Sequence, residues 1–229
     1  MGDKTVLVTG SSKGLGEQLA KIFSKNNYNI ILHGRNLERL KIVKESILED
    51  GVKCDIVIGD LRDINTITAL TEIAEIKNID ILINNAGVYL NRSISETSFE
   101  DYRNIIESNM LAPIYLIKQL FPFFDKKREG LIININSFAG KNGSDGESAY
   151  CASKHGLRGF INSIQYDAVR AGIRIIDVYL GAMNTDMVNG RKDKEKCIST
   201  IEAADFIFKF CSEYKSMRVN EIDLARRIY

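Results

Sequence analysis

The sequence contains few of the residues that mark several other classes of protein. Its 229 residues include no tryptophan, two prolines, two histidines and four cysteines. The cysteines show no C-x-x-C spacing, and with only two histidines we expect no metal cluster. Lys and Arg number 31 against 30 Asp and Glu, which gives a net charge of +1. This balance argues against a nucleic-acid-binding surface.

Long apolar runs are also absent. The longest candidate, 114–124, is interrupted by Lys118, Gln119 and Pro122, so we expect no membrane span. The first residues lead almost directly into a predicted strand, which leaves no room for a signal peptide. We therefore expect a reduced, cytoplasmic protein. The scarcity of proline and the lack of a Gly/Ser-rich linker favour a single domain over residues 1–229.

The sequence does contain a regular alternation of short β-branched runs and longer helical stretches. Apolar strands are predicted at 5–9, 29–33, 54–58, 79–83, 131–135 and 173–179. Helices are predicted at 15–25, 37–49, 63–76, 99–121 and 148–170, with a last helix and strand within 199–224. Strands that are apolar on both faces are typical of a parallel sheet covered by helices on each side. The pattern predicts a doubly wound, Rossmann-type α/β fold in three layers, with ligands beyond the carboxyl ends of the strands.

A glycine-rich segment follows the first predicted strand. Glycines there allow a tight turn, and the helix behind them offers unpaired N–H groups to a phosphate. The candidate cofactor-binding residues of this segment are Gly10, Ser12, Lys13, Gly14, Leu15 and Gly16. The Gly-x-x-x-Gly-x-Gly spacing differs from the commoner Gly-x-Gly-x-x-Gly, so it does not identify the ligand by itself. A glycine turn that binds nothing is the alternative.

The end of the second strand narrows the choice of ligand. An acid there usually binds the ribose 2′-OH of NAD, whereas an arginine accommodates the 2′-phosphate of NADP. Here Arg35 follows the strand without an acid before Glu38, and Lys13 adds a second cation. The two cations predict that NADP(H) is preferred over NAD(H). A solvated Arg35 with no ligand is the alternative.

Small and polar residues follow the third and fourth strands. Asp60 and Leu61 come after the third, where the acid could accept a hydrogen bond from an adenine amino group. Asn85, Ala86 and Gly87 come after the fourth, and they suit a position where the backbone must pass a ribose. All five are therefore candidate cofactor-binding residues.

Tyr150 and Lys154 stand four residues apart, on the same face of a predicted helix. An ammonium beside a phenol stabilises the phenolate and lowers the phenol's pKa. Ser137 follows the fifth strand, so we expect all three side chains at the cofactor edge of the sheet. This convergence weighs against the alternative, a chance Tyr–Lys pair on a helix surface.

Five ordered motifs together carry a family resemblance. They are Thr9-Gly10-x-x-x-Gly14-x-Gly16, Asn84-Asn85-Ala86-Gly87, Asn109, Ser137 and Tyr150-x-x-x-Lys154. This combination resembles the short-chain dehydrogenase/reductase family in its compact single-domain form, over about residues 4–185.

The resemblance implies a role for each catalytic residue. Tyr150 would be the general acid or base at the carbonyl or alcohol oxygen, and Ser137 would hydrogen-bond that oxygen. Lys154 would lower the pKa of Tyr150 and bind the nicotinamide ribose. Asn109 would anchor a water in a proton relay, with an ordinary packing role as the alternative. The resemblance also implies a homodimer or homotetramer formed through the helices at 99–121 and 148–170.

The sequence departs from the family pattern after the sixth strand. Leu180 stands where the family usually has proline, while Gly181 and Thr185 keep their places. A proline would stiffen this turn, so we expect its absence to loosen the segment without loss of cofactor binding. The Met183 backbone is expected to meet the carboxamide, and Thr185 the pyrophosphate.

The substrate side is less informative. Residues 186–211 form a short, charged loop and a helix, which suggests an open pocket. Its expected lining is Ser137, Tyr150, Tyr89, Phe138, Met183 and Met187. Such a lining fits a small or medium carbonyl compound but does not identify one.

The predicted site residues bear on three candidate functions. The favoured one is an NADP-dependent oxidoreductase that reduces a carbonyl compound to an alcohol, or the reverse. An NADP(H)-binding regulator or sensor with little turnover is the alternative, and the intact Ser137, Tyr150 and Lys154 weigh against it. An epimerase or dehydratase of nucleotide sugars would need a larger C-terminal region than residues 186–229.

Overall fold

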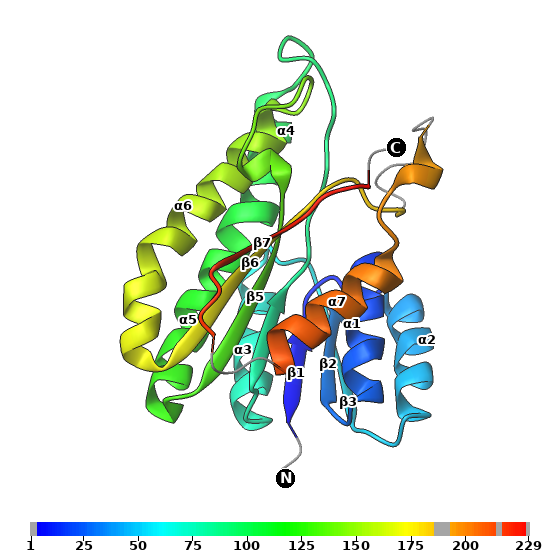
Figure 1. The fold of residues 1–229 in the computed structure, drawn as a ribbon, viewed down its shortest axis with the longest axis vertical. Coiled ribbons are helices and arrows are strands. Elements are labelled where there is room, and N and C mark those ends of the chain that lie inside the picture. The colour runs from blue at the N-terminus through cyan, green and yellow to red at the C-terminus, as the bar shows by residue number, and fades with distance from the viewer. Residues whose placement is uncertain (1–3, 186–192, 214–216, 228–229) are drawn as a thin grey trace.

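Seven parallel strands form one sheet in the computed structural model, which describes residues 4–185, 193–213 and 217–227. The strands are β1 (Thr5–Val8), β2 (Asn29–Gly34), β3 (Cys54–Ile58), β4 (Ile81–Asn84), β5 (Gly130–Ser137), β6 (Ile173–Leu180) and β7 (Glu221–Leu224). Their spatial order is β3-β2-β1-β4-β5-β6-β7 (Figure 1). The order reverses between β1 and β4, so the ligand-binding switch point of such a sheet lies beyond the carboxyl ends of these two strands.

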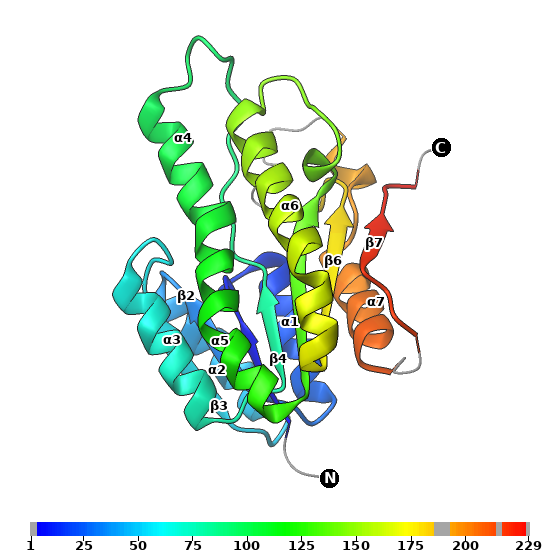
Figure 2. The same cartoon turned by 90° about the vertical axis from the view of Figure 1, so that its left-hand side faces the viewer.

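Helices cover both sides of this sheet (Figures 1 and 2). One side carries α1 (Gly14–Lys25), α2 (Leu37–Leu48) and α7 (Thr200–Glu213). The other carries α3 (Ile64–Ile76), α5 (Ala112–Lys127) and α6 (Ser148–Ala171). The helix α4 (Phe99–Ile106) leads into α5 through a π-helical turn, η1 (Glu107–Leu111). These three layers confirm the predicted doubly wound, Rossmann-type α/β fold.

The largest error in the predicted bounds concerns the helix at 99–121. The segment is helical as far as Lys127, and it contains both the π-helical turn and Pro122. Proline removes one backbone N–H from a helix, but Pro122 is exposed, so water can satisfy the carbonyl group that it leaves unpaired. The helix ends where Arg128 adopts the left-handed conformation, with φ of 55°.

Successive strand residues point to opposite sides of the sheet, and the two sides differ. On the side of α1, α2 and α7, here called the α1 face, the apolar cluster reaches the carboxyl ends of the strands at Leu32, Ile135 and Leu180. On the side of α3, α5 and α6, here called the α6 face, the cluster contains the earlier strand residues Leu7, Ile31, Leu82, Ile132 and Ile175. Polar residues then follow in the alternation, all buried: Thr9, His33, Asn84, Asn134, Asn136 and Asp177.

Candidate active site

The glycine-rich turn after β1 has a backbone conformation that residues with a side chain could not adopt at Gly10 and Gly16. Gly10 has a φ of +64°, and a Cβ on Gly16 would lie 2.4 Å from Asn85 Nδ2. Asn85 Nδ2 donates to the carbonyl oxygens of Thr9 at 2.9 Å and Gly10 at 3.1 Å. The N-cap residue of α1, Lys13, makes no side-chain capping hydrogen bond to the first turn, which begins at Gly14. The open cradle and the uncapped helix N-terminus fit a phosphate group.

Thr9 and His33 are among the side chains that join this turn to the neighbouring strands. Thr9 Oγ1 accepts from the backbone N–H groups of Asn85 at 3.0 Å and Ala86 at 3.1 Å. His33 Nδ1 accepts from Gly10 N at 3.4 Å, which places the ring proton on Nε2, 3.2 Å from the Gly59 carbonyl oxygen. Burial lowers the pKa of His33 to about 4, so the ring is neutral at neutral pH. Sequence reasoning missed His33, whose only signal was a polar residue near the end of an apolar strand.

A cluster of charges lies beyond β2 and β3. Arg62 Nε and Nη2 donate to the two carboxylate oxygens of Asp60 at 3.1 and 2.9 Å. Arg35 lies 3.6 Å from the same carboxylate, with 65% of its side chain exposed. The hydrogen bonds from Arg62 hold the pKa of Asp60 at about 2. Two guanidinium groups against one carboxylate leave this corner positive, and Arg62 was not predicted. Because Arg62 occupies both oxygens of Asp60, the predicted contact with adenine stays a prediction.

Other predicted cofactor residues lie at the same edge of the sheet. Leu15 and Leu61 bury their side chains in the core, which leaves their backbones for a ligand. Ser12 lies beside Gly34, because a Cβ on that glycine would be 3.3 Å from the Ser12 side chain. The Thr185 methyl group would lie 3.4 Å from a Cβ on Gly14, so Thr185 closes on the glycine turn.

Leu180, which stands in place of the family proline, lies within the sheet. It is a strand residue paired with both Ser137 on β5 and Leu224 on β7, and its side chain is buried. The Gly181 N–H continues the pairing by donating to the Leu224 carbonyl at 3.0 Å. Strand pairing on both sides therefore holds Leu180 and Gly181, and the loosening of the turn that follows stays a prediction.

The three predicted catalytic residues meet at the carboxyl end of β5. Ser137 ends that strand, and Tyr150 and Lys154 lie on the first two turns of α6. Lys154 is 5% exposed, and its Nζ donates to the Ile135 carbonyl at 3.0 Å and lies 5.9 Å from the centre of the Tyr150 ring. Ser137 hydrogen-bonds the Tyr150 hydroxyl.

Burial shifts the pKa values of Tyr150 and Lys154. Burial raises the pKa of Tyr150 to about 12, and the hydrogen bond from Ser137 offsets only part of that shift. Burial also lowers the pKa of Lys154 to about 8. Burial dominates the pKa of Tyr150, so the lowering of that pKa by Lys154 stays a prediction. At neutral pH the side chains are a neutral phenol and an ammonium.

Asn109 lies in the π-helical turn η1 and is buried. Its side chain accepts from the Val88 N–H at 2.8 Å and donates to the Val88 carbonyl at 2.8 Å. It also donates to Ser153 Oγ at 3.3 Å. These hydrogen bonds join the segment after Gly87 to α6, as expected if Asn109 has an ordinary packing role. The proton-relay role stays a prediction.

The substrate side is only partly described. The Tyr89 ring meets the Tyr150 ring edge to face at 5.2 Å, and its hydroxyl donates to Glu147 Oε1 at 2.7 Å. Phe138 opens a short 3-10 turn directly after Ser137. Met183 packs into the cluster of the α1 face, so its contact with a substrate stays a prediction. Met187 lies outside the described residues, as do the other loop residues from 186 to 192. Glu147 was not predicted.

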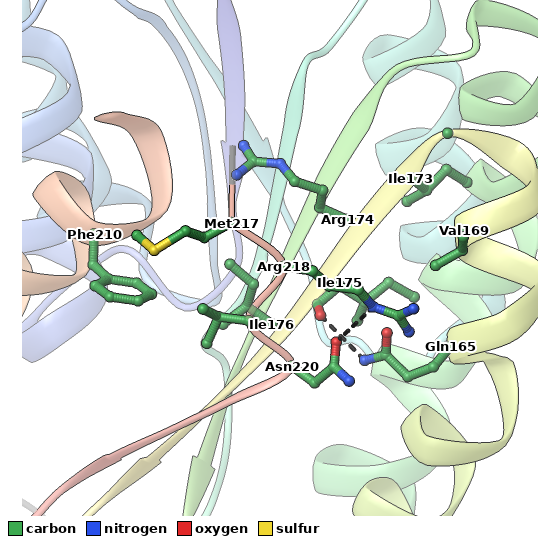
Figure 3. A pocket seen from close by; sticks show the side chains of 12 residues that line it. Gln165, Val169, Ile173, Arg174, Ile175, Ile176, Phe210, Met217, Arg218 and Asn220 are labelled. Carbon is green, nitrogen blue, oxygen red and sulfur yellow. Dashed lines mark hydrogen bonds between the residues drawn. The ribbon is translucent and has the colours of Figure 1, made fainter. Parts of the chain in front are cut away.

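A cavity of about 310 Å³ lies far along the sheet from these residues. It is lined by the last turns of α6, the first residues of β6 and the segment before β7, as Gln165, Ile173 and Asn220 show in Figure 3. Ser137 lies at the opposite end of the sheet, so this cavity is not the place for the predicted chemistry.

Over residues 4–185, 193–213 and 217–227, no three His, Cys, Asp or Glu side chains are grouped to hold a metal ion. Within the same ranges no helix has the length and apolar character that crossing a membrane requires.

Known proteins share this sequence pattern. The family model for short chain dehydrogenases matches residues 4–196. Dehydrogenase/reductase SDR family member 7 of Mus musculus is 34% identical over 200 residues, which cover 84% of this chain and 59% of that protein. The chain thus spans less than two thirds of that relative. The 3-oxoacyl-(acyl-carrier-protein) reductase FabG of Rickettsia typhi is 30% identical over 193 residues, covering 84% of this chain and 78% of that one.

A solved structure shares the whole architecture. It is a metagenomic short-chain oxidoreductase in complex with NADP, with a TM-score of 0.86 and 25% identity. The match covers 99% of this chain and 98% of that chain.

Proposed function

The chain belongs to the short-chain dehydrogenase/reductase family, and on that premise we propose that it is an NADPH-dependent reductase of small or medium carbonyl compounds. The observation that carries the proposal is the convergence of Ser137, Tyr150 and Lys154 at the carboxyl end of β5. This end of the sheet is also the one that bears the glycine turn.

Tyr150 is the proton donor in this proposal. Its pKa of about 12 keeps the phenol protonated at neutral pH, which suits a general acid. Ser137 hydrogen-bonds the carbonyl oxygen that receives the proton, and so favours the negative charge that develops there. Lys154, an ammonium at neutral pH, stabilises the phenolate that remains. Bound NADPH would supply the hydride. The protonated phenol favours carbonyl reduction over alcohol oxidation at neutral pH.

The proposed cofactor contacts follow from the shapes and charges of the site. Gly10, Gly14 and Gly16 leave room for the pyrophosphate at the N-terminus of α1. Arg35 and Lys13 would bind the 2′-phosphate, and the lack of an acid after β2 supports NADPH over NADH. The bound NADP of the metagenomic relative supports the same choice.

The proposed substrate is a carbonyl compound that reaches Tyr150 past aromatic side chains. Tyr89 and Phe138 offer a partly apolar border. The Rickettsia relative is named as a reductase of 3-oxoacyl groups, so the range of proposed substrates includes acyl chains with a keto group.

The test is the loss of NADPH absorbance with a panel of aldehydes, ketones and one 3-oxoacyl thioester, repeated with NADH. We expect turnover of at least one compound, with NADPH used in preference to NADH. Tight NADPH binding without turnover on any compound would instead favour a cofactor-binding regulator.

Three further predictions also belong to this proposal. We propose a single domain, a cytoplasmic location and a homodimer or homotetramer formed through the α4–α5 and α6 helices. Sedimentation of the purified protein would distinguish the two oligomers from a monomer.

A further inference from the structure

A row of polar side chains crosses the α6 face at one level of the sheet. The strand register places Asn84, Asn134, Asp177 and Glu221 side by side on β4, β5, β6 and β7. Asn84 Nδ2 donates to Asn134 Oδ1 at 2.9 Å, and Asn134 Nδ2 donates to Asp177 Oδ1 at 3.0 Å. The row therefore leads from the strand beside the glycine turn to a carboxylate buried under α6.

Asp177 is 1% exposed, yet a chain of contacts connects it to the edge of the sheet. The Tyr179 hydroxyl donates to Asp177 Oδ2 at 3.1 Å and also lies 3.4 Å from Glu221 Oε1. Glu221 is paired with Lys141 at 2.9 Å and with Arg158 at 3.2 Å. The buried carboxylate is thus hydrogen-bonded on both oxygens, as a buried ionised acid requires.

The side chain of Lys154, on α6, reaches the sheet beside this row of polar residues. Its Nζ donates to the carbonyl of Ile135, the residue that follows Asn134 on β5. A buried ammonium is costly unless negative charge compensates it. Asp177 is hydrogen-bonded to Asn134, the residue next to Ile135, so its carboxylate lies in the same buried layer as the ammonium. Its negative charge raises the pKa of Lys154 against the effect of burial.

We propose that Asp177 is a positioning residue of the proton-transfer site, whose buried carboxylate keeps Lys154 in its ammonium form beside Tyr150. The proposal rests on the proposed function, in which the charge of Lys154 stabilises the Tyr150 phenolate. Asp177 acts only through Lys154.

The charged and titratable groups around Asp177 come from α6, β6 and β7. They are Lys154 and Arg158 on α6, Tyr179 on β6 and Glu221 on β7. Burial raises the pKa of Asp177 to about 6, and the hydrogen bonds from Asn134 and Tyr179 oppose that shift. With Lys154 near 8, the acid and the ammonium are both charged at neutral pH.

Ionising a buried acid of this kind costs stability. Its raised pKa means that the folded state disfavours the carboxylate at neutral pH. Residues that are unfavourable for stability occur mostly at functional sites. The buried ammonium of Lys154, bonded to the residue next to Asn134, supplies the functional reason here.

The first test is a double-mutant cycle in unfolding, with Asp177→Asn, Lys154→Met and both changes, by denaturant at neutral pH. In the Lys154→Met protein the acid has lost its cation, so the effect of Asp177→Asn on stability should be more favourable there than in the wild type. We expect a coupling of about tenfold in the unfolding equilibrium constant. Additive effects would overturn the proposal. Asp223→Asn is the matched control, an acid on β7 that is paired with Lys141 at 2.6 Å, and it should be additive with Lys154→Met.

The second test is the pH dependence of NADPH oxidation, with benzaldehyde as the carbonyl probe. Loss of the Asp177 charge lowers the pKa of Lys154, so the alkaline fall in rate should move about one pH unit lower in Asp177→Asn. Asp223→Asn should keep the wild-type profile. An unchanged profile in Asp177→Asn would contradict the proposal.

Two further experiments cover a variant that does not fold and a wild type without turnover. Should Asp177→Asn fail to fold, Tyr179→Phe removes one hydrogen bond to the carboxylate and should shift the profile in the same direction by less; no shift there would overturn the proposal. Should the wild type reduce no carbonyl compound, the proposed function fails, and the unfolding cycle alone still decides whether Asp177 holds the Lys154 charge.

Discussion

The two faces of the sheet differ in how polar their buried residues are near the carboxyl ends of the strands. The α1 face is apolar as far as Ile135 and Leu180, where the strands end. The α6 face changes from apolar residues such as Ile132 to polar ones such as Asn134 and Asp177 along the same strands. Alternate residues of each strand thus serve stability on one side and a polar layer beneath the candidate active site on the other.

The buried side chains of the two faces also differ in their contacts. Phe23 on the α1 face is fully buried and meets Tyr28 and Phe208 edge to face at 5.1 and 5.0 Å. On the α6 face, Asn84 Oδ1 is buried with no hydrogen-bond partner among the residues that the structure describes. Unpaired buried polar atoms destabilise a fold, so the polar layer lowers stability while it arranges the site. Substitutions on the two faces should therefore separate activity from stability.

The largest expected effect is on turnover. Tyr150→Phe removes the proton donor of the α6 side and should lower the rate of carbonyl reduction by about a thousandfold. The affinity for NADPH should change little, because the ring remains. Steady-state rates and NADPH fluorescence titration check the two halves. A variant that keeps a near-normal rate would show that Tyr150 is not the acid.

The next effect is on stability, and it belongs to the α1 face. Phe23→Ala should lower the free energy of unfolding by about 4 kcal/mol, the usual loss for a fully buried phenylalanine. The folded fraction should keep the wild-type rate. Ile201→Ala, on an exposed position of α7, is the control and should change stability by less than about 0.5 kcal/mol. A large loss of rate in folded Phe23→Ala would erase the distinction between the faces.

Asp177→Asn should change stability in a pH-dependent way. The folded pKa of Asp177 is raised from 3.8 to about 6, so the wild type loses stability as the pH rises through that range. The amide does not titrate, so the stability of the variant relative to the wild type should rise by roughly 3 kcal/mol between about pH 4 and neutral pH. Denaturant unfolding across this range measures it, and a relative stability that falls as the pH rises would contradict the sign.

The smallest effect concerns the cofactor. Arg35→Ala should raise the KM for NADPH about tenfold, the loss of roughly one charged contact, and leave the KM for NADH nearly unchanged. Arg103→Ala is the control, since Arg103 is as exposed as Arg35, at 68% against 65%, but lies on α4. Equal changes for both cofactors in Arg35→Ala would mean that the 2′-phosphate is bound elsewhere.

Local patterns predicted the order of strands and helices, the glycine turn and the Ser137, Tyr150 and Lys154 group. These features depend on residues close in sequence or on the rule that parallel strands end at one edge. Asp177 could not be predicted in this way, because its partner Asn134 is 43 residues away and only the strand register brings them together. The bonds of His33 and the pairing of Arg62 with Asp60 likewise depend on how neighbouring strands end. The pairing of Leu180 with Leu224 on β7 depends on the strand register in the same way.

The most direct test of the central claim is to measure alcohol formed and NADPH consumed together, in the wild type and in Tyr150→Phe, with one reducible carbonyl compound. The account predicts one alcohol for each NADPH in the wild type, and a rate about a thousandfold lower in Tyr150→Phe with NADPH still bound. Alcohol formation at similar rates in both proteins would contradict it.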